Sequence, residues 1–240
     1  MADDMIRNAI RWTKALRSLP KTIWFNFHYL PFKQAIKLPI LLYKPKLLRC
    51  KGTITLKGKI EFGMVHLGFY IVPNYPNSGI VWNVRGDVVF DTYCIIGNDS
   101  VIDVGKSGCL TFGDNFVTSA AVKINCYKGI TFGHHTGLSW GCSFLDTDFH
   151  QVKIDNPDGS VTTSKGYAPI AIGNYNWIAA NTTVMKATKT PDYCIVGANS
   201  TLLKDYSHLP QKCFIVGNPA VLKKENIYVE LQDDEMNYDD

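Results

Sequence analysis

The chain has 240 residues, 46% of them hydrophobic and 19% charged, and its formal net charge is +4. This length and composition predict one main domain with a sizeable core and a short appendage. The seven cysteines are odd in number and include no CxxC pair, which argues against a disulfide framework and a zinc ribbon. No cleavable signal pattern and no apolar run of membrane-spanning length is present, so we expect a cytoplasmic protein.

Residues 1–50 form a basic and apolar region that differs from the rest of the chain. Up to Lys57 the chain carries twelve Lys and Arg residues against only Asp3 and Asp4, interleaved with large apolar residues such as Trp24. Residues 4–18 contain no Pro or Gly and predict an amphipathic helix, which we expect Pro20 to end.

Two compatible interpretations of this region stay open. In the first, it is a helical cap on the open end of the domain that follows, with its apolar face buried and its charges in solvent. In the second, the basic and aromatic face attaches the protein peripherally to an anionic membrane, the inner membrane surface in a cytoplasmic protein. No nucleic-acid partner is expected, because no nucleic-acid-binding motif surrounds the positive charge.

A six-residue period of apolar residues runs through the second region, residues 51–224. The residues in phase are Ile96 and Ile102, then Phe112, Thr118 and Ile124, then Phe132, Leu138 and Phe144, and finally Ile172, Ile178, Val184, Val196 and Leu202. Only Thr190 interrupts the last run. A helix or a simple alternating strand does not have this period, whereas a short strand and a corner repeated three times per coil does. The pattern predicts a parallel β-helix; an antiparallel sandwich explains the turns but not the fixed phase.

Glycines beside apolar residues mark the expected corners of the coils. Examples are Gly97, Gly113 and Gly173, where a positive φ or a close approach of two coils is easiest for glycine. Asn and Asp residues follow them and favour tight turns. Four cysteines recur at roughly one coil length, and we expect them to stack in the core as reduced thiols: Cys94, Cys109, Cys126 and Cys142.

A polar insertion, Gln151 to Pro169, interrupts the repeat, and an acidic tail follows it at the end of the chain. The insertion comes directly after the segment LDTDFHQV, Leu145 to Val152. Insertions of this length in compact domains are functional lids or disordered segments. The tail, residues 225–240, carries six Asp and Glu residues from Glu230 onward and is expected to be frayed.

Four motifs carry a resemblance to a known family. They are DTDFH at residues 146–150, IGNYNWIAANTTV at 172–184, IVGANSTLLKD at 195–205 and FIVGNPAVLKK at 214–224. With the repeat, which covers about residues 90–224, they resemble the hexapeptide-repeat, left-handed β-helix acyltransferases. The most similar of these are the acetyl-CoA-dependent O-acetyltransferases of sugars and bacterial surface glycans. The resemblance implies a left-handed coil, a homotrimer with active sites between subunits, acetyl-CoA as co-substrate and a sugar or glycan acceptor.

His150 matches the position of the family's catalytic histidine, which implies a general base that removes the proton of the attacking hydroxyl. A hydrogen-bonded corner histidine is the alternative. Asp148 and Asp146 orient the imidazole or stabilise its protonated form, or else they cap backbone N–H groups at a corner. For Asp146 the residues favour the capping role.

The donor site also follows from the resemblance. Trp177 matches the tryptophan that flanks the pantetheine arm, although an aromatic ladder on the exterior explains it equally well. Ala180 and Ala198 match positions whose backbone groups bond the pantetheine amides. Lys204 and Lys224 match basic positions that contact the phosphates of the coenzyme, and Lys224 replaces an Arg of the relatives.

Acceptor and metal sites are less defined by the sequence. Asn125 and Ser139 are candidates for contact with the acceptor. His134 and His135 resemble zinc-binding histidines of γ-class carbonic anhydrases, which share the fold, but a third well-spaced histidine is missing. We therefore expect no metal. The remaining alternatives are an N-acyltransferase of an amino-sugar nucleotide and a non-catalytic, structural or glycan-binding β-helix.

Overall fold

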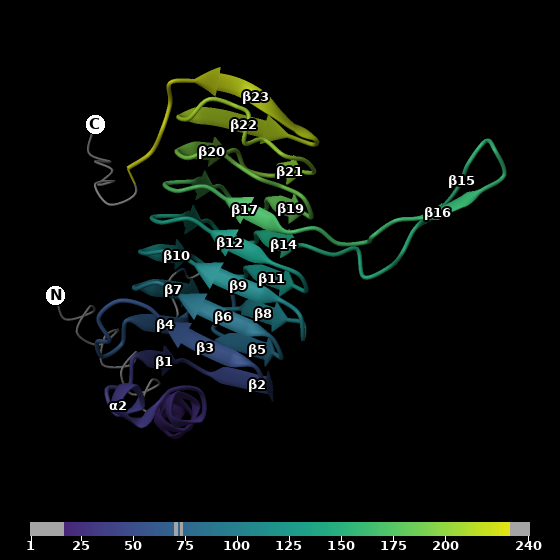
Figure 1. Ribbon diagram of the computed structural model, residues 1–240. Coiled ribbons are helices and arrows are strands. Elements are labelled where there is room, and N and C mark those ends of the chain that lie inside the picture. The colour runs from purple at the N-terminus through teal and green to yellow at the C-terminus, as the bar shows by residue number, and fades with distance from the viewer. Residues whose placement is uncertain (1–16, 70–71, 73, 231–240) are drawn as a thin grey trace.

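The computed structural model describes residues 17–69, 72 and 74–230, which form a parallel β-helix (Figure 1). Most coils contribute one strand to each of three sheets, and the sheets form the three faces of a prism. In Figure 1 the strands on the near face run from right to left while the coils rise toward the C-terminal end, which is a left-handed winding. The predicted left-handed parallel β-helix is confirmed.

The chain visits face 1, face 2 and face 3 in that order. Face 1 consists of β1 (Ile40–Leu42), β4 (Val65–Phe69), β7 (Cys94–Gly97), β10 (Phe116–Thr118), β13 (Gly137–Leu138), β18 (Trp177–Ile178), β20 (Cys194–Val196), β22 (Cys213–Gly217) and β23 (Ala220–Glu225). Face 2 consists of β2 (Pro45–Cys50), β5 (Ile80–Val84), β8 (Ser100–Val104), β11 (Lys123–Cys126), β14 (Ser143–Leu145), β19 (Thr183–Met185) and β21 (Thr201–Leu202). Face 3 consists of β3 (Thr53–Leu56), β6 (Asp87–Phe90), β9 (Cys109–Phe112), β12 (Ile130–Phe132) and β17 (Ile170–Ile172).

The residues of the six-residue period point into the prism from successive faces. Ile172, Ile178 and Val184 lie on faces 3, 1 and 2, and each is at most 3% exposed. Burial of one such side chain stabilises the fold by about 1.5–3 kcal/mol, so a period that buries three per coil favours stacking strongly. Thr190, the polar residue in phase, is also buried, and its hydroxyl donates to Asn176 Oδ1 at 2.8 Å. The interruption in the pattern is therefore a satisfied polar position of the core.

The corner glycines are required by close approach and not by a positive φ. A Cβ on Gly133 would lie 2.5 Å from the backbone carbon of Gly173, and one on Gly173 would lie 2.5 Å from the carbonyl oxygen of Pro191. The positive φ falls two residues later, on His135 and Tyr175 in the same corners (φ 53° and 55°). The sequence left two reasons open for a corner glycine, a positive φ and a close approach of two coils. At Gly133 and Gly173 the reason is the close approach.

A helical cap closes the N-terminal end of the prism, as one interpretation of residues 1–50 predicted (Figure 1). Residues 17–29 are helical, and a short helix, α2 (Phe32–Ala35), follows them. Three polar side chains at four-residue spacing accept backbone N–H groups along the outer edge of β1. The bonds are Lys44 N to Ser18 Oγ at 3.0 Å, Leu42 N to Thr22 Oγ1 at 3.2 Å and Ile40 N to Asn26 Oδ1 at 3.1 Å. The cap therefore protects an edge strand that would otherwise be open to pairing.

Two expectations for the N-terminal region need correction or qualification. The prediction that Pro20 ends a helix is wrong, because residues on both sides of it are helical. The segment that follows Pro20 is held against the prism by Thr22 and Asn26, which bond to the backbone of β1, and by Phe25, which is fully buried. Most of the predicted helix 4–18 lies outside the described residues. The first coil begins with β1 and β2, so the boundary predicted at residue 51 falls inside it. Within the described residues, no helix is long and apolar enough to cross a membrane.

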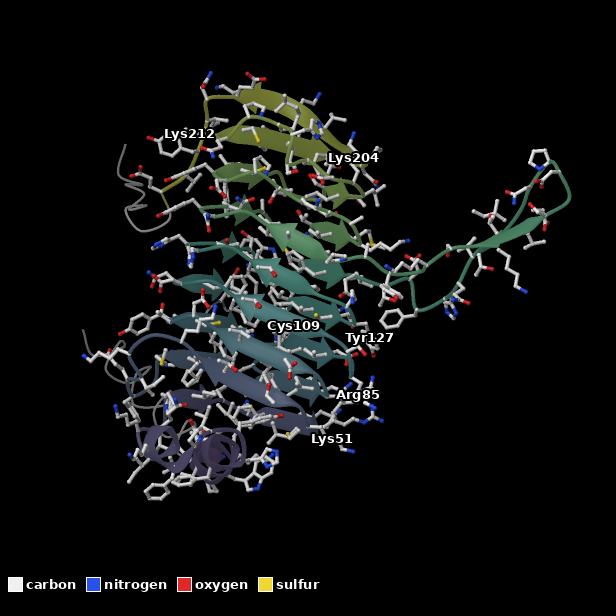
Figure 2. All side chains as sticks on the ribbon, viewed as in Figure 1. Lys51, Arg85, Cys109, Tyr127, Lys204 and Lys212 are labelled. Carbon is white, nitrogen blue, oxygen red and sulfur yellow. The ribbon has the colours of Figure 1, made fainter. Side chains whose placement is uncertain are left out.

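The C-terminal end closes differently. β23 turns back and pairs antiparallel with β22, which covers the last coil with an added strand. β23 ends at Glu225, and residues 231–240 of the acidic tail lie outside the described residues. The cysteine expectation is wrong for Cys109, which is exposed on face 3 (Figure 2), whereas Cys94, Cys126 and Cys142 are buried. The cysteines do not stack, because their spacings place Cys94 on face 1, Cys109 on face 3 and Cys126 on face 2.

Candidate active site

The insertion after β14 is an arm that projects from the edge between face 2 and face 3 (Figure 1). Its outer part is an antiparallel hairpin of β15 (Lys153–Asp155) and β16 (Val161–Thr163), and every residue of both strands is exposed. An isolated two-stranded hairpin is only marginally stable in water. The insertion is therefore an arm with an exposed hairpin at its outer end, whereas the sequence left a functional lid and a disordered segment as alternatives.

The neck of the arm brings residues 146–150 against residues 166–168. Asp148 N donates to Gly166 O at 2.8 Å, and Ala168 N donates to Asp146 O at 3.0 Å. Gly166 has a φ of +72°, and a Cβ there would lie 2.8 Å from the carbonyl oxygen of His150. These bonds hold the backbone at Asp146 and Asp148, just before His150, and the close approach of Gly166 to His150 leaves no room for a side chain.

The side chain of Asp146 is fully buried, and its carboxylate is saturated by one corner of the preceding coil. Its Oδ1 accepts Tyr127 N at 2.8 Å, and its Oδ2 accepts Lys128 N and Gly129 N at 2.7 Å each. A carboxylate with three backbone donors is strongly held. The sequence left two roles open for Asp146, orienting the imidazole and capping backbone N–H groups, and this geometry favours capping.

Asp148 forms an ion pair with Lys186, which follows β19 one coil above. Both side chains are partly exposed, so the pair lies at the surface of the same edge that carries His150. One oxygen of the Asp148 carboxylate is therefore engaged by the ammonium group. Sequence reasoning missed Lys186. The two residues are 38 positions apart, and only the stacking of the coils on either side of the insertion shows that Lys186 lies next to Asp148.

His150 lies exposed at the base of the arm, directly after Phe149. Phe149 has a φ of +59°, a conformation that a bulky residue adopts only when its surroundings hold it. Its ring packs edge-on against Tyr127, with ring centroids 5.0 Å apart, and Arg85 lies 5.9 Å from the Tyr127 ring centroid. Figure 2 shows Tyr127 and Arg85 below the arm on the same edge of the prism. The imidazole is thus presented to solvent above an aromatic and basic surface.

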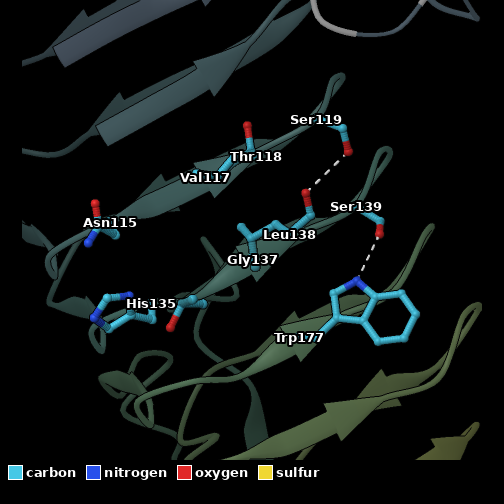
Figure 3. A pocket seen from close by; sticks show the side chains of 10 residues that line it. Asn115, Val117, Thr118, Ser119, His135, Gly137, Leu138, Ser139 and Trp177 are labelled. Carbon is cyan, nitrogen blue, oxygen red and sulfur yellow. Dashed lines mark hydrogen bonds between the residues drawn. The ribbon is translucent and has the colours of Figure 1, made fainter. Parts of the chain in front are cut away.

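A hollow of about 380 Å³ lies on the outer surface of face 1 (Figure 3). Its middle is Gly137, which has no side chain, between Val117 of the coil below and Trp177 of the coil above. Ser119 and Ser139 line one end, and Trp177 Nε1 donates to Ser139 Oγ at 3.3 Å. His135 and Asn115 line the other end. The hollow is an extended, mostly apolar surface of a size that fits a narrow ligand.

His150 and this hollow lie on opposite sides of one chain. His150 sits at the edge between faces 2 and 3, whereas Trp177 and Ser139 belong to face 1, which is the face across the prism from that edge. Two of the predicted site residues, Trp177 and Ser139, are therefore brought together, but the structure does not bring either of them to His150 in the same chain.

The remaining predicted cofactor residues are also divided between edges. Ala180 and Ala198 lie at the corner after face 1, where Ala180 O accepts Asn199 N at 2.9 Å. Lys204 follows β21 on the edge of His150, with its Nζ 5.6 Å from the Tyr206 ring centroid, and Figure 2 shows it on the same side as the arm. Lys224 is exposed in β23 at the C-terminal end.

Asn125 lies on face 2, beside a polar row that runs toward the edge of His150. It is the Cα partner of Asp103 and Leu145, and the Asp103 carboxylate accepts Asn83 Nδ2 at 2.8 Å and Tyr127 Oη at 3.3 Å. Burial and the charge of Asp103 together raise the pKa of Tyr127. The two acceptor candidates are thus on different faces, Asn125 with His150 and Ser139 with the hollow.

The paired histidines hold the fold in place at the corner between faces 3 and 1. His134 Nδ1 accepts Asp114 N at 2.9 Å, while the His135 ring stacks on Tyr175 with centroids 4.8 Å apart. Over the part of the chain that the structure describes, no three His, Cys, Asp or Glu residues gather closely enough to hold a metal ion.

Comparisons with known proteins agree with the resemblance. WbbJ of Escherichia coli K12, named as a lipopolysaccharide biosynthesis O-acetyl transferase, is 27% identical over 154 residues, which cover 55% of this chain and 76% of that protein. WcaF of the same strain, named as a colanic acid biosynthesis acetyltransferase, is 31% identical over 121 residues, which cover 50% of this chain and 61% of WcaF. The chain thus spans less than two thirds of WcaF. No family model matches the chain.

Among solved structures, the polySia-specific acetyltransferase NeuO superposes with a TM-score of 0.48 at 18% identity, covering 80% of this chain and 74% of that one. The names of the curated relatives confirm the resemblance to acyltransferases of sugars and surface glycans, and they agree with the prediction of an enzyme of this class.

Proposed function

We propose that the chain is an acetyl-CoA-dependent O-acetyltransferase that acts on a sugar hydroxyl of a bacterial surface polysaccharide or its precursor. The curated relatives are named for this chemistry, which supports the reaction class. The observation that carries the proposal is the position of His150, exposed at the base of an arm that needs a partner surface.

The proposed site is shared between two protomers of a homotrimer. His150 and the hollow around Trp177 lie on opposite sides of one chain, so a single chain cannot hold both ends of an acetyl donor and its base together. In a closed ring of protomers, the edge of one chain can face the face-1 surface of the next. The projecting arm supports this arrangement, because its exposed strands lie on the edge that would meet the neighbour.

In the proposed reaction, the His150 imidazole accepts the proton of the sugar hydroxyl while the oxygen attacks the thioester carbonyl. The acetyl group passes to the sugar, the carbon–sulfur bond breaks, and the thiolate of coenzyme A recovers the proton from the imidazolium. Trp177 and the apolar hollow would hold the pantetheine arm, and the exposed lysines Lys204 and Lys224 would meet its phosphates. Asp148 and Lys186 would position the neck, and Asp146 would hold the corner below it.

The test is release of coenzyme A from acetyl-CoA in the presence of acceptor glycans, followed by chromatography. A thiol reagent is unsuitable, because the exposed Cys109 would react with it. Hydroxyl acceptors and amino-sugar nucleotides are offered side by side. Acetylation of the hydroxyl acceptors supports the proposal, and exclusive use of the amine would assign an N-acyltransferase. If the chain releases no coenzyme A and shows no thermal shift with acetyl-CoA, the remaining alternative is the non-catalytic β-helix.

A further inference from the structure

The cap at the N-terminal end has a second, outward surface that the fold does not use. Ser18, Thr22, Phe25 and Asn26 of the helical segment 17–29 face the first coil and are at most 5% exposed. Large apolar side chains lie on the other side and on α2. They are Leu19 (38% exposed), Ile23 (42%), Trp24 (48%), Phe27 (44%), Phe32 (68%) and Ile36 (60%), and we refer to them as the apolar end face.

The apolar end face is continuous and regular. Leu19, Ile23 and Phe27 follow one another at four-residue spacing and therefore form one stripe along the helix. The stripe continues into α2, because the ring centroids of Phe27 and Phe32 are 5.9 Å apart. In a helix that already has one buried side, a second apolar stripe of this kind marks an interaction surface.

The charges around this surface have one sign. From residue 17 to residue 60 the chain contains no Asp or Glu, and the next acidic residue after this stretch is Glu61. Arg17, Lys21, Lys33 and Lys37 belong to the same helical segments and to the turn that follows α2. The Nζ atoms of Lys21 and Lys37 reach the carbonyl oxygens of Pro45 and Ile60, at 3.0 and 3.3 Å. The described part of the cap, residues 17–60, is thus apolar at its outer surface and carries only basic charges.

We propose that the apolar end face binds the surface of an anionic membrane, so that the β-helix stands on the bilayer by its N-terminal end. Exposed Trp and Phe residues beside Lys and Arg are the composition of interfacial membrane-binding helices. Basic residues near an anionic surface add attraction that salt weakens. A second copy of the chain fits less well, because a two-fold contact through this face would place like charges opposite each other.

This orientation places the proposed active site at a defined height above the membrane. Only this height, and not the membrane binding itself, rests on the proposed function. Face 2 rises by four strand spacings from β2 to β14, which is on the order of 20 Å. The base of the arm would therefore lie above the bilayer at the level of a sugar carried on an extended lipid-linked precursor. A small soluble acceptor would gain nothing from such an arrangement.

The experiment is co-sedimentation of the full chain with vesicles of phosphatidylcholine alone or with about one third phosphatidylglycerol. We expect binding to the anionic vesicles that falls with added salt and is weak with the neutral ones. The double substitution Phe32→Ser/Ile36→Ser should reduce the partition coefficient about tenfold or more. Leu203→Ser, at a side chain that is 50% exposed near the other end of the prism, is the matched control and should bind like the original chain.

Two charge-reversal variants measure how much electrostatic attraction contributes to vesicle binding. Lys33→Glu should weaken binding to anionic vesicles, and Lys223→Glu at the C-terminal end should not. The proposal is overturned if the chain ignores anionic vesicles at low salt, or if Phe32→Ser/Ile36→Ser binds as tightly as the original. Loss of an end-to-end dimer in that variant, seen by light scattering without any vesicle binding, would assign the face to a second copy. Vesicle binding does not depend on acetyl transfer, so its failure is distinguishable from failure of the proposed function.

Discussion

Asp148 and Lys186 form an ion pair that ties the neck of the arm to the coil above it. The pair is partly exposed, so it contributes only about 0–1 kcal/mol to the free energy of unfolding. We expect it to act on turnover by holding the backbone next to His150. Asp148→Ala and Lys186→Ala should each lower kcat by a similar factor of about ten, and the double variant should lose little more.

The measurement is a double-mutant cycle on kcat, with the swapped pair Asp148→Lys/Lys186→Asp as an added variant. Partial recovery in the swap supports a positioning role. Losses that multiply in the double variant would show that the two side chains act independently.

His150→Ala should remove turnover without unfolding the chain. General-base catalysis contributes about 10²- to 10⁴-fold, and we expect a loss of that size in kcat. The side chain is exposed, so the melting temperature should stay close to that of the original chain. A thermal melt and a coenzyme A release assay on the same preparation check both points. Near-normal turnover would remove the assignment.

Asp146→Ala should act on stability. Three backbone N–H groups would lose their acceptor in a buried corner, and we expect the free energy of unfolding to fall by about 3 kcal/mol or more. Asp158→Ala is the matched control, because Asp158 also accepts a backbone N–H, from Ser160, but on the exposed tip of the arm. Denaturant unfolding should separate the two variants. A stable Asp146→Ala chain that has lost turnover would instead give Asp146 a catalytic role.

Gly133→Ala tests the contact between coils. The added Cβ would lie 2.5 Å from the backbone of Gly173, and we expect a loss of about 2 kcal/mol or more. Gly159→Ala in the arm is the control. An added Cβ there meets no atom within 4 Å, and only the positive φ disfavours alanine, so the free energy of unfolding should fall by about 1 kcal/mol. Equal melting temperatures for the two variants would contradict the close-approach explanation.

The fold could be predicted from the sequence because the period of six records burial directly. A position such as Val184 must be apolar in every coil, whatever the details of the corner. Local preference misled the prediction where tertiary contacts decide. Pro20 lies in a helical segment that Thr22, Phe25 and Asn26 hold against the prism. Cys109 points outward because it precedes the buried Leu110 on β9, where side chains alternate between the two sides of the strand.

The candidate site could be predicted only in part. Motif positions located His150 and Trp177, but a sequence has no information on which edge of the prism each one reaches. Lys186 and Gly137 belong to no recognised motif. Only the stacking of the coils places Lys186 next to Asp148 and Gly137 next to Trp177. The hairpin of the arm could not be predicted either, because the side chains of both its strands are exposed and leave no burial pattern in the sequence.

The most direct test of a shared site is mixing of two variants that are inactive alone. His150→Ala removes the base, and Gly137→Leu fills the hollow on face 1 while leaving the base in place. If each site combines one edge with the face of a neighbour, mixed assemblies contain about one quarter intact sites, and co-expression should restore activity to about that level. Co-expression of His150→Ala with the chain that carries both substitutions is the control and should restore none. Activity in the mixture no higher than the sum of the separate variants would contradict a site built by two protomers.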